Sequence, residues 1–79
     1  MEIYPISPWK VQIPVNRDSP SERDIKHQMG RLQTEGQIEP IVVKPDGSFD
    51  TDHPDYWYYS PAQVIAARRL NWDTILVTF

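Results

Sequence analysis

The sequence predicts a small α+β domain with a mixed sheet of about four strands and two helices. Three observations lead to this prediction. Two segments with helical spacing of apolar residues follow Ser-Pro pairs, at Ser19-Pro20 and at Ser60-Pro61. Short apolar runs rich in β-branched and aromatic residues lie before, between and after these segments. The chain has 79 residues, a length that suits one domain spanning residues 1–79.

Prolines divide the beginning of the chain into short pieces, at positions 5, 8, 14 and 20. Because proline in a sheet is confined to edges and strand ends, we expect a short edge strand over residues 3–6 and a turn over residues 8–10. Trp9, Val11 and Ile13 alternate with polar residues, which predicts a half-buried extended segment.

The first helix has the strongest signals in the sequence. Ser19 is expected to cap it, Pro20 suits its first position, and the Glu22 carboxylate can reach back to the Ser19 amide. Gly36 supplies the left-handed residue that ends the helix. The apolar face repeats at spacings of four and three residues, at Ile25, Met29 and Leu32.

The next strand is predicted over residues 41–44. Their nearly continuous apolar character is typical of a central strand that is covered on both faces. A turn over residues 45–48 contains proline and glycine, and Phe49 is expected to begin a returning strand. Residues 56–59 are all aromatic, which predicts a further strand.

The second helix uses the same start signal as the first. Ser60 is expected to cap it, with Pro61 at the first position and Gln63 at the third. The helix should run to about Leu70, where Asn71 can take a left-handed exit conformation. Its expected inner face contains Ile65, Ala66 and Leu70. Residues 74–79 alternate in polarity and predict a final strand.

Composition excludes several classes of function. The chain has no cysteine, so disulfide frameworks, zinc–thiolate sites and cysteine redox chemistry are excluded. Neither a signal peptide nor a membrane-spanning stretch is visible, so we expect a cytoplasmic protein with no membrane partner. The formal net charge of −3 disfavours non-specific DNA binding, although one segment contains a local group of cations. These cations are Arg17, Arg23, Lys26 and Arg31.

Two motifs resemble the ParB/sulfiredoxin-type domain, and the amino-terminal domain of ParB in particular. The first is Gly36-Gln37 followed by Pro40-Ile41-Val42-Val43, directly after the first helix. The second is the passage from Ala66 to Ile75, which is similar to the pattern A-A-x-x-L-G-x-x-x-I of that family. The order of predicted elements agrees with the family over nearly the whole chain. The resemblance implies a plasmid or phage setting and a nucleotide pocket.

The phosphate motif of that family is degenerate here. Gly-x-Arg-Arg opens the second helix in the family, and Ser60-Pro61-Ala62-Gln63 stands at that position in this chain. Both arginines and the glycine are missing, and the proline removes an amide donor. We therefore expect a binding module that acts through protein–protein contacts and binds nucleotides weakly or not at all. The resemblance implies that a residual pocket would be lined by Arg17, Gly36, Gln37, Pro40, Ser60 and Gln63.

Two other functions stay open. Asp50, Asp52, His53 and Asp55 have the residue types of a site for Mg²⁺ or Mn²⁺, which would suit a metal-dependent nuclease or nucleotidase. The same residues could equally form a solvated acidic loop that binds no metal. Our first expectation is therefore a protein without enzyme activity and without a cofactor. The other alternative is a non-catalytic accessory protein that binds DNA.

Large aromatic residues predict an interaction surface. Three tryptophans and four tyrosines offer more aromatic area than a core of this size encloses. We expect Trp57 or Tyr59, with Tyr4 or Trp9 nearby, to form a patch for a protein partner or for self-association. Alternatively, residues 56–59 could stack with the bases of a single-stranded nucleic acid.

Overall fold

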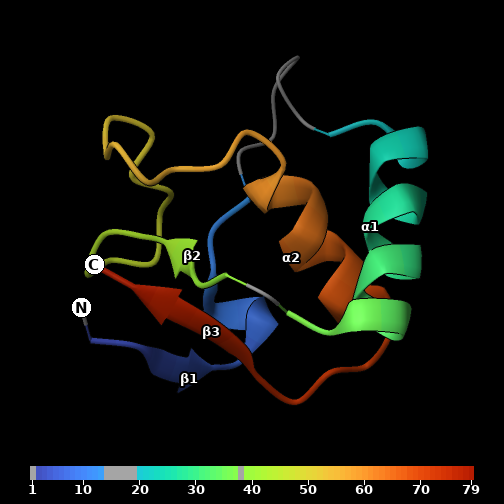
Figure 1. Cartoon of the computed structure of the whole chain (residues 1–79). Helices are drawn as coiled ribbons and strands as arrows, with labels where there is room; N and C mark the ends of the chain where they lie inside the picture. Colours follow the sequence, from blue (N-terminus) through green and yellow to red (C-terminus); the bar gives the residue numbers. More distant parts are fainter. Residues whose placement is uncertain (1, 14–19, 38) are drawn as a thin grey trace.

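Two helices and a three-strand mixed sheet form the described part of the protein (Figure 1). The structure is a computed structural model, and it describes residues 2–13, 20–37 and 39–79. The elements in chain order are β1 (Tyr4–Ile6), the short 3-10 helix η1 (Pro8–Lys10), α1 (Glu22–Glu35), β2 (Ile41–Val42), α2 (Ser60–Arg69) and β3 (Ile75–Thr78). The α+β prediction is confirmed.

The last strand of the chain is the centre of the sheet. The strand order is β1-β3-β2, with β1 antiparallel and β2 parallel to β3. Val77 of β3 is paired with Tyr4 on one side and with Ile41 on the other, and its side chain is fully buried. The parallel pairing of β2 with β3 requires a crossover connection, which α2 provides.

The predicted central position of residues 41–44 is wrong, and the prediction of about four strands is not confirmed. Only Ile41–Val42 forms a strand, and it lies at an edge of the three-strand sheet. Beyond that edge, Phe49 forms an isolated bridge with Val43, so the expected returning strand is reduced to one residue pair. Burial of the apolar run was predicted correctly, but burial alone does not determine the order of strands.

Residues 56–59 form no strand, and Tyr58 and Tyr59 lie in a turn, so the predicted aromatic strand is wrong as well. The backbone N–H of Tyr56 donates to the His53 carbonyl, and that of Ser60 donates to the Trp57 carbonyl. Both bonds span three residues, which is the spacing of a turn. The aromatic rings stack on their sequence neighbours: the Tyr59 ring centroid lies 5.6 Å from Trp57 and 5.2 Å from Tyr58.

Helix α1 begins two residues later than predicted. The Ser21 hydroxyl oxygen accepts the backbone N–H of Asp24 at 3.2 Å and caps the helix. Pro20 therefore precedes the cap, and the predicted cap, Ser19, lies outside the described residues. The chain offers a serine followed three residues later by an acidic residue at both positions, 19 and 21, so local spacing alone does not choose between them.

The end and the buried face of α1 agree better with the sequence. Gly36 has a φ of 74°, and its N–H donates to the Leu32 carbonyl at 3.0 Å, which confirms the predicted stop. Ile25 and Leu32 are buried and Met29 is half-buried. Gln28 is also buried, on the same side of the helix.

Helix α2 starts at Ser60 without the predicted hydroxyl cap. Tyr59 occupies the cap position and makes no side-chain capping bond, while Ser60 lies inside the helix and is only 2% exposed. In Figure 1, α2 lies between α1 and β3. That position explains why α2 is buried around most of its circumference, whereas the sequence predicted one inner face. The half-buried Ile65 and Leu70 pack against the core, and Asn71 follows with a φ of 59°.

Arg68 connects α2 to the amino-terminal segment. Its Nε donates to the Pro8 carbonyl at 2.9 Å, and its Nη2 donates to the Val11 carbonyl at 2.6 Å. The guanidinium also lies 4.8 Å from the centre of the Trp9 ring. The segment before α1, which contributes the buried Val11 to the core, is held against the carboxyl end of α2 by these contacts.

Candidate binding groove

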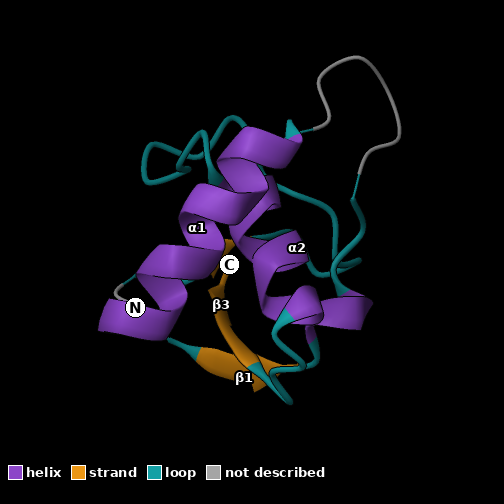
Figure 2. Ribbon diagram, turned by 90° about the vertical axis from the view of Figure 1, so that its right-hand side faces the viewer, coloured by secondary structure: helices purple, strands orange, loops and turns teal. Residues whose placement is uncertain are grey.

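An open groove of about 760 Å³ lies where four segments meet: the chain after η1, the start of α1, residues 48–51, and the aromatic residues that lead into α2. Figure 1 shows α2 between α1 and the loop that precedes α2, and Figure 2 shows α1 and α2 side by side in front of β3. The lining residues are Gln12, Ile13, Pro20, Ser21, Asp24, Ser48, Phe49, Thr51, Tyr56, Tyr58, Tyr59, Pro61 and Ala62.

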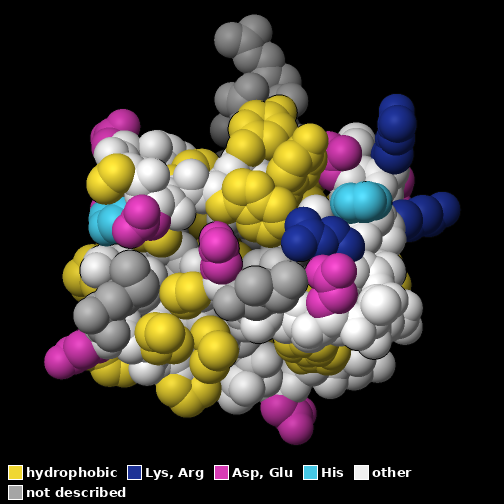
Figure 3. Space-filling view, viewed as in Figure 1, with side chains coloured by type: hydrophobic (Ala, Val, Ile, Leu, Met, Phe, Trp, Pro, Cys, Tyr) yellow, Lys and Arg dark blue, Asp and Glu magenta, His cyan; other side chains and the backbone are white. Residues whose placement is uncertain are grey.

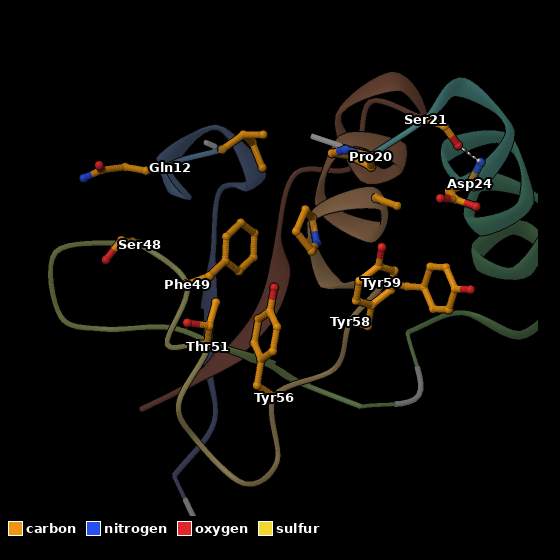
Figure 4. A pocket seen from close by; sticks show the side chains of 13 residues that line it. Gln12, Pro20, Ser21, Asp24, Ser48, Phe49, Thr51, Tyr56, Tyr58 and Tyr59 are labelled. Carbon is orange, nitrogen blue, oxygen red and sulfur yellow. Dashed lines mark hydrogen bonds between the residues drawn. The ribbon is translucent and has the colours of Figure 1, made fainter. Parts of the chain in front are cut away.

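Aromatic rings form two sides of this groove (Figure 4). Phe49 and Tyr56 lie on one side, with their ring centroids 6.2 Å apart in an edge-to-face arrangement. Tyr58 and Tyr59 lie on the other side. Tyr58 is 79% exposed and Tyr59 is 39% exposed. An apolar, planar or proline-like group would therefore find ring faces on both sides of the groove.

The groove has an acidic and hydroxyl-rich polar character. Asp24 is the only charged side chain among the described lining residues. Burial raises the pKa of the Tyr56 hydroxyl above its ordinary value, and like any tyrosine hydroxyl this group is protonated at neutral pH. Thr51 brings a second hydroxyl from the loop that contains Asp50 and Asp52. Neutral hydroxyls and one carboxylate are suited to a ligand that offers carbonyl acceptors and a positive charge.

Three consecutive aromatic residues, Trp57, Tyr58 and Tyr59, form what we call the aromatic cluster. Figure 3 shows hydrophobic side chains gathered over the start of α2, next to positively charged side chains. Arg31 of α1 contacts the cluster, because its guanidinium carbon lies 5.4 Å from the centre of the Trp57 ring. Such a cation–π contact limits the motion of the half-buried Trp57 ring. The cluster therefore combines exposed aromatic area with a restrained arrangement of rings.

The other two predicted interaction residues lie elsewhere. Tyr4 of β1 stacks on Phe79, with 5.4 Å between the ring centroids. Trp9 is 70% exposed and lies over Arg68. Figure 1 shows β1 at the lower edge of the molecule, and η1 lies near the carboxyl end of α2, where Arg68 donates to the Pro8 carbonyl. Exposure of these aromatic residues agrees with the prediction, but a single patch that joins them to the aromatic cluster is not formed.

The residues of the predicted nucleotide pocket are dispersed. Gly36 and Gln63 line a small cavity of about 250 Å³ together with Arg31 and Trp57, whereas Pro40 lines a neighbouring surface cavity. Gln37 and Ser60 do not line these two cavities. Ser60 is buried in the core, and Arg17 lies outside the described residues.

Gln37, which the resemblance placed at the residual pocket, bonds to the central strand through its side-chain amide. Its Nε2 donates to the Leu76 carbonyl at 2.9 Å, and its Oε1 accepts the Leu76 N–H at 2.7 Å. The side-chain amide thus bonds to β3 as a neighbouring strand would.

Two other glutamines have an unpaired oxygen. The Oε1 atoms of Gln28 and Gln63 are buried and accept no hydrogen bond within the described part of the chain. Gln28 faces a cavity that also contacts Arg31, Trp57 and Tyr59.

The acidic loop does not assemble a metal site. His53 Nδ1 accepts the backbone N–H of Asp55 at 3.1 Å, and the His53 N–H donates to the Asp50 carbonyl. Over residues 2–13, 20–37 and 39–79, no three histidine or carboxylate side chains come together as candidate metal ligands. The arrangement of this loop therefore gives the metal-dependent alternative no geometric support.

Sequence reasoning missed Phe49, Tyr56, Tyr58 and Asp24 as members of one site. The available signal was the run of aromatic residues before Ser60-Pro61, which was interpreted as a strand with alternating faces. In a strand, successive side chains point to opposite faces, whereas in this turn the three successive rings of Trp57, Tyr58 and Tyr59 lie against one another beside the groove. Asp24 joins them only because α1 packs on α2, a contact between distant parts of the sequence.

Comparison with protein-family models, with curated proteins and with solved structures gives no match to this chain. Among the helices of the described segments, none has the length and apolar character needed to cross a membrane. Interpretation of the groove consequently depends on the geometry of this chain.

Proposed function

We propose that this domain is a binding module that acts through protein–protein contacts, with the aromatic cluster and the adjoining groove as its contact surface. The observation that carries the proposal is the exposure of Tyr58, at 79%, within a stacked group of rings beside a groove of about 760 Å³. An isolated exposed aromatic residue is common on protein surfaces. A stacked cluster beside a groove is a more specific signal of an interaction surface.

Physical chemistry favours aromatic residues for this task. Tyrosine and tryptophan provide a large apolar area, a polar tip and few rotatable bonds, so little conformational entropy is lost on binding. Here the rings are already held by edge-to-face stacking and by Arg31. Pre-organisation of this kind increases affinity because fewer side chains must be ordered when a partner binds.

The proposal includes the resemblance to ParB: the domain would be a ParB-like module of a plasmid or phage whose phosphate motif is degenerate. Burial of Ser60, the proline after it and the use of Gln37 in the sheet all support weak nucleotide binding or none. Calorimetric titration with CTP and with ATP, each with Mg²⁺, tests this part. We expect no measurable binding heat, and micromolar affinity for either nucleotide would contradict it.

Site-specific photo-crosslinking tests the contact surface. A photoreactive phenylalanine analogue replaces Tyr58 in one sample and Gln33, an exposed residue on α1, in a matched control. We expect position 58 to form a discrete protein adduct in the native cells, and position 33 to form none. The mass of the adduct separates a second copy of this chain from a different partner. Equal adducts at both positions, or none at position 58, would contradict the proposal.

A further inference from the structure

We propose that a second cavity, between α1 and the aromatic cluster, binds a free α-amino acid with an apolar side chain. This cavity has a volume of about 740 Å³ and adjoins the groove, with which it shares Ser21, Asp24 and Tyr59. All its lining residues belong to α1 with its cap or to the aromatic cluster. Such a site is independent of the protein contact proposed for Tyr58, which does not line this cavity.

The buried amide of Gln28 is the observation that points to a ligand. Gln28 is only 1% exposed and lines this cavity, and its Oε1 accepts no hydrogen bond within the described part of the chain. A buried acceptor without a donor is destabilising, and in native proteins such a group often marks a bound water, an ion or a functional role. The last torsion of glutamine is soft, so the amide can turn its oxygen towards the cavity. A ligand at this position should therefore bring N–H groups.

Opposite charges flank Gln28 along the same face of α1. Asp24, Gln28 and Arg31 follow one another at spacings of four and three residues, and all of them line the cavity, so they form a row along the helix. The two ends of such a row are about 10 Å apart along the helix axis, and an arginine side chain projects back towards the amino terminus. The carboxylate and the guanidinium therefore approach a ligand from the two ends of the row, with the amide between them.

An α-amino acid matches this row. Its ammonium group can donate to the Asp24 carboxylate and to the Gln28 oxygen, while its carboxylate accepts hydrogen bonds from Arg31. An anion alone would leave Asp24 and Gln28 without a donor, and a cation alone would be repelled by Arg31 and by Arg23, which also lines the cavity. A ligand that carries both charges satisfies the whole row.

Arg31 is held in position for this contact. Its guanidinium carbon lies 5.4 Å from the centre of the Trp57 ring, and its Nε lies 3.6 Å from a carboxylate oxygen of Glu35. Because that ion pair is exposed, it contributes little to stability, and the guanidinium has further N–H groups that can bind a ligand carboxylate.

The aromatic cluster adds an apolar wall to the cavity. Trp57 is half-buried and Tyr59 is 39% exposed, and both line the cavity. Figure 3 shows hydrophobic side chains directly beside basic side chains and a histidine. An apolar side chain of the ligand would be buried against these rings, so phenylalanine should bind better than serine.

Nuclear magnetic resonance titration of the labelled chain tests the inference. The probe is phenylalanine; phenylalaninamide lacks its carboxylate, 3-phenylpropanoate lacks its ammonium group, and serine lacks its apolar side chain. We expect saturable shifts of the Trp57 indole N–H and of the Gln28 side-chain amide with phenylalanine, and about tenfold weaker binding of each analogue. The Trp9 indole N–H is the internal control, because Trp9 lies over Arg68 and does not line the cavity. Equal binding of phenylalaninamide or 3-phenylpropanoate, or no saturable shift of the Trp57 signal at millimolar phenylalanine, would overturn the inference.

Two variants locate the two charges of the ligand. Asp24→Asn should weaken phenylalanine binding about tenfold and remove its advantage over 3-phenylpropanoate. Arg31→Met should weaken it about tenfold and remove its advantage over phenylalaninamide. Gln33→Met, at an exposed position of α1, is the matched control and should change neither preference. A general disturbance of the helix would weaken every probe alike, so a loss of affinity with unchanged preferences would contradict the assigned contacts.

Gln28→Met separates binding from folding. We expect this variant to bind phenylalanine about tenfold more weakly, because the ammonium group loses an acceptor, while its unfolding temperature does not fall. Unchanged affinity for phenylalanine in Gln28→Met would overturn the role of the buried amide. The probe preferences of the native chain test the site without this variant.

Discussion

The side-chain amide of Gln37 pairs with the backbone of Leu76 through two hydrogen bonds, one donated at 2.9 Å and one accepted at 2.7 Å. Gln37 follows the helix stop at Gly36, and Leu76 lies in the central strand β3. This contact joins the connector after α1 to the sheet without any backbone pairing. It gives a structural reason for a glutamine at a position that the resemblance had associated with a nucleotide.

Replacing Gln37 should therefore affect stability. We expect Gln37→Ala to lower the free energy of unfolding by about 1–2 kcal/mol, because two hydrogen bonds are lost at once. Urea denaturation measures the change. Gln33→Ala on the exposed side of α1 is the matched control and should change stability little. Equal effects of the two substitutions would show that the bonds to Leu76 contribute nothing.

Arg68 and Arg69 are neighbours with different expected effects. Arg68→Lys should cost about 2–3 kcal/mol, because lysine lacks the fork that reaches the carbonyls of Pro8 and Val11 together. Arg69→Lys should cost less, because Arg69 pairs with Glu22 on an exposed surface. Thermal unfolding of the two variants gives the comparison. A larger loss for Arg69→Lys would contradict the anchoring role of Arg68.

Gln28 offers a route to a more stable protein. Its Oε1 is buried without a hydrogen-bond donor among the described residues, and an unpaired buried acceptor is destabilising. Methionine has a similar shape and no such requirement, so Gln28→Met should raise the free energy of unfolding by about 1 kcal/mol. Gln33→Met is the exposed control. A clear loss of stability in Gln28→Met would instead indicate that the oxygen has a partner in solution.

The ion pair between Glu22 and Arg69 predicts a change in pH dependence. The hydrogen bond from Arg69 lowers the pKa of the Glu22 carboxyl below its ordinary value. A lowered carboxyl pKa stabilises the folded state above the ordinary pKa, and this contribution disappears as the pH falls through the lowered value. Glu22→Gln should therefore reduce the loss of stability on acidification relative to the native chain.

Arg69→Met provides the control for this prediction. Without the guanidinium, the Glu22 pKa should return towards its ordinary value, so the variant should show the same reduced acid dependence as Glu22→Gln. Urea denaturation at a series of pH values from neutral to acidic measures both. An unchanged acid dependence in the two variants would show that the pair does not contribute to stability.

Local signals identified both helices and the final strand. Gly36 ends α1 because a left-handed residue is needed there, and that requirement involves only the preceding turn. The Ser-Pro pairs mark the starts of the helices to within two residues. Burial of Ile41 was also predictable, because a continuous apolar run avoids water wherever it lies in a sheet.

The arrangement of these elements was decided by contacts between distant residues. Val77 lies at the centre of the sheet because both Tyr4 and Ile41 pair with it. The residues next to Val77 in the sequence do not indicate this, because they would suit an edge strand equally well. Tyr58 is exposed beside the groove because it lies in a turn, whereas the β propensity of residues 56–59 alone favours a strand. The sequence by itself determined which segments are helical and which are buried, since those properties depend on neighbours a few positions away. Only the tertiary structure decided the strand order and the groove, because packing between segments far apart in the chain overrides a weak local preference.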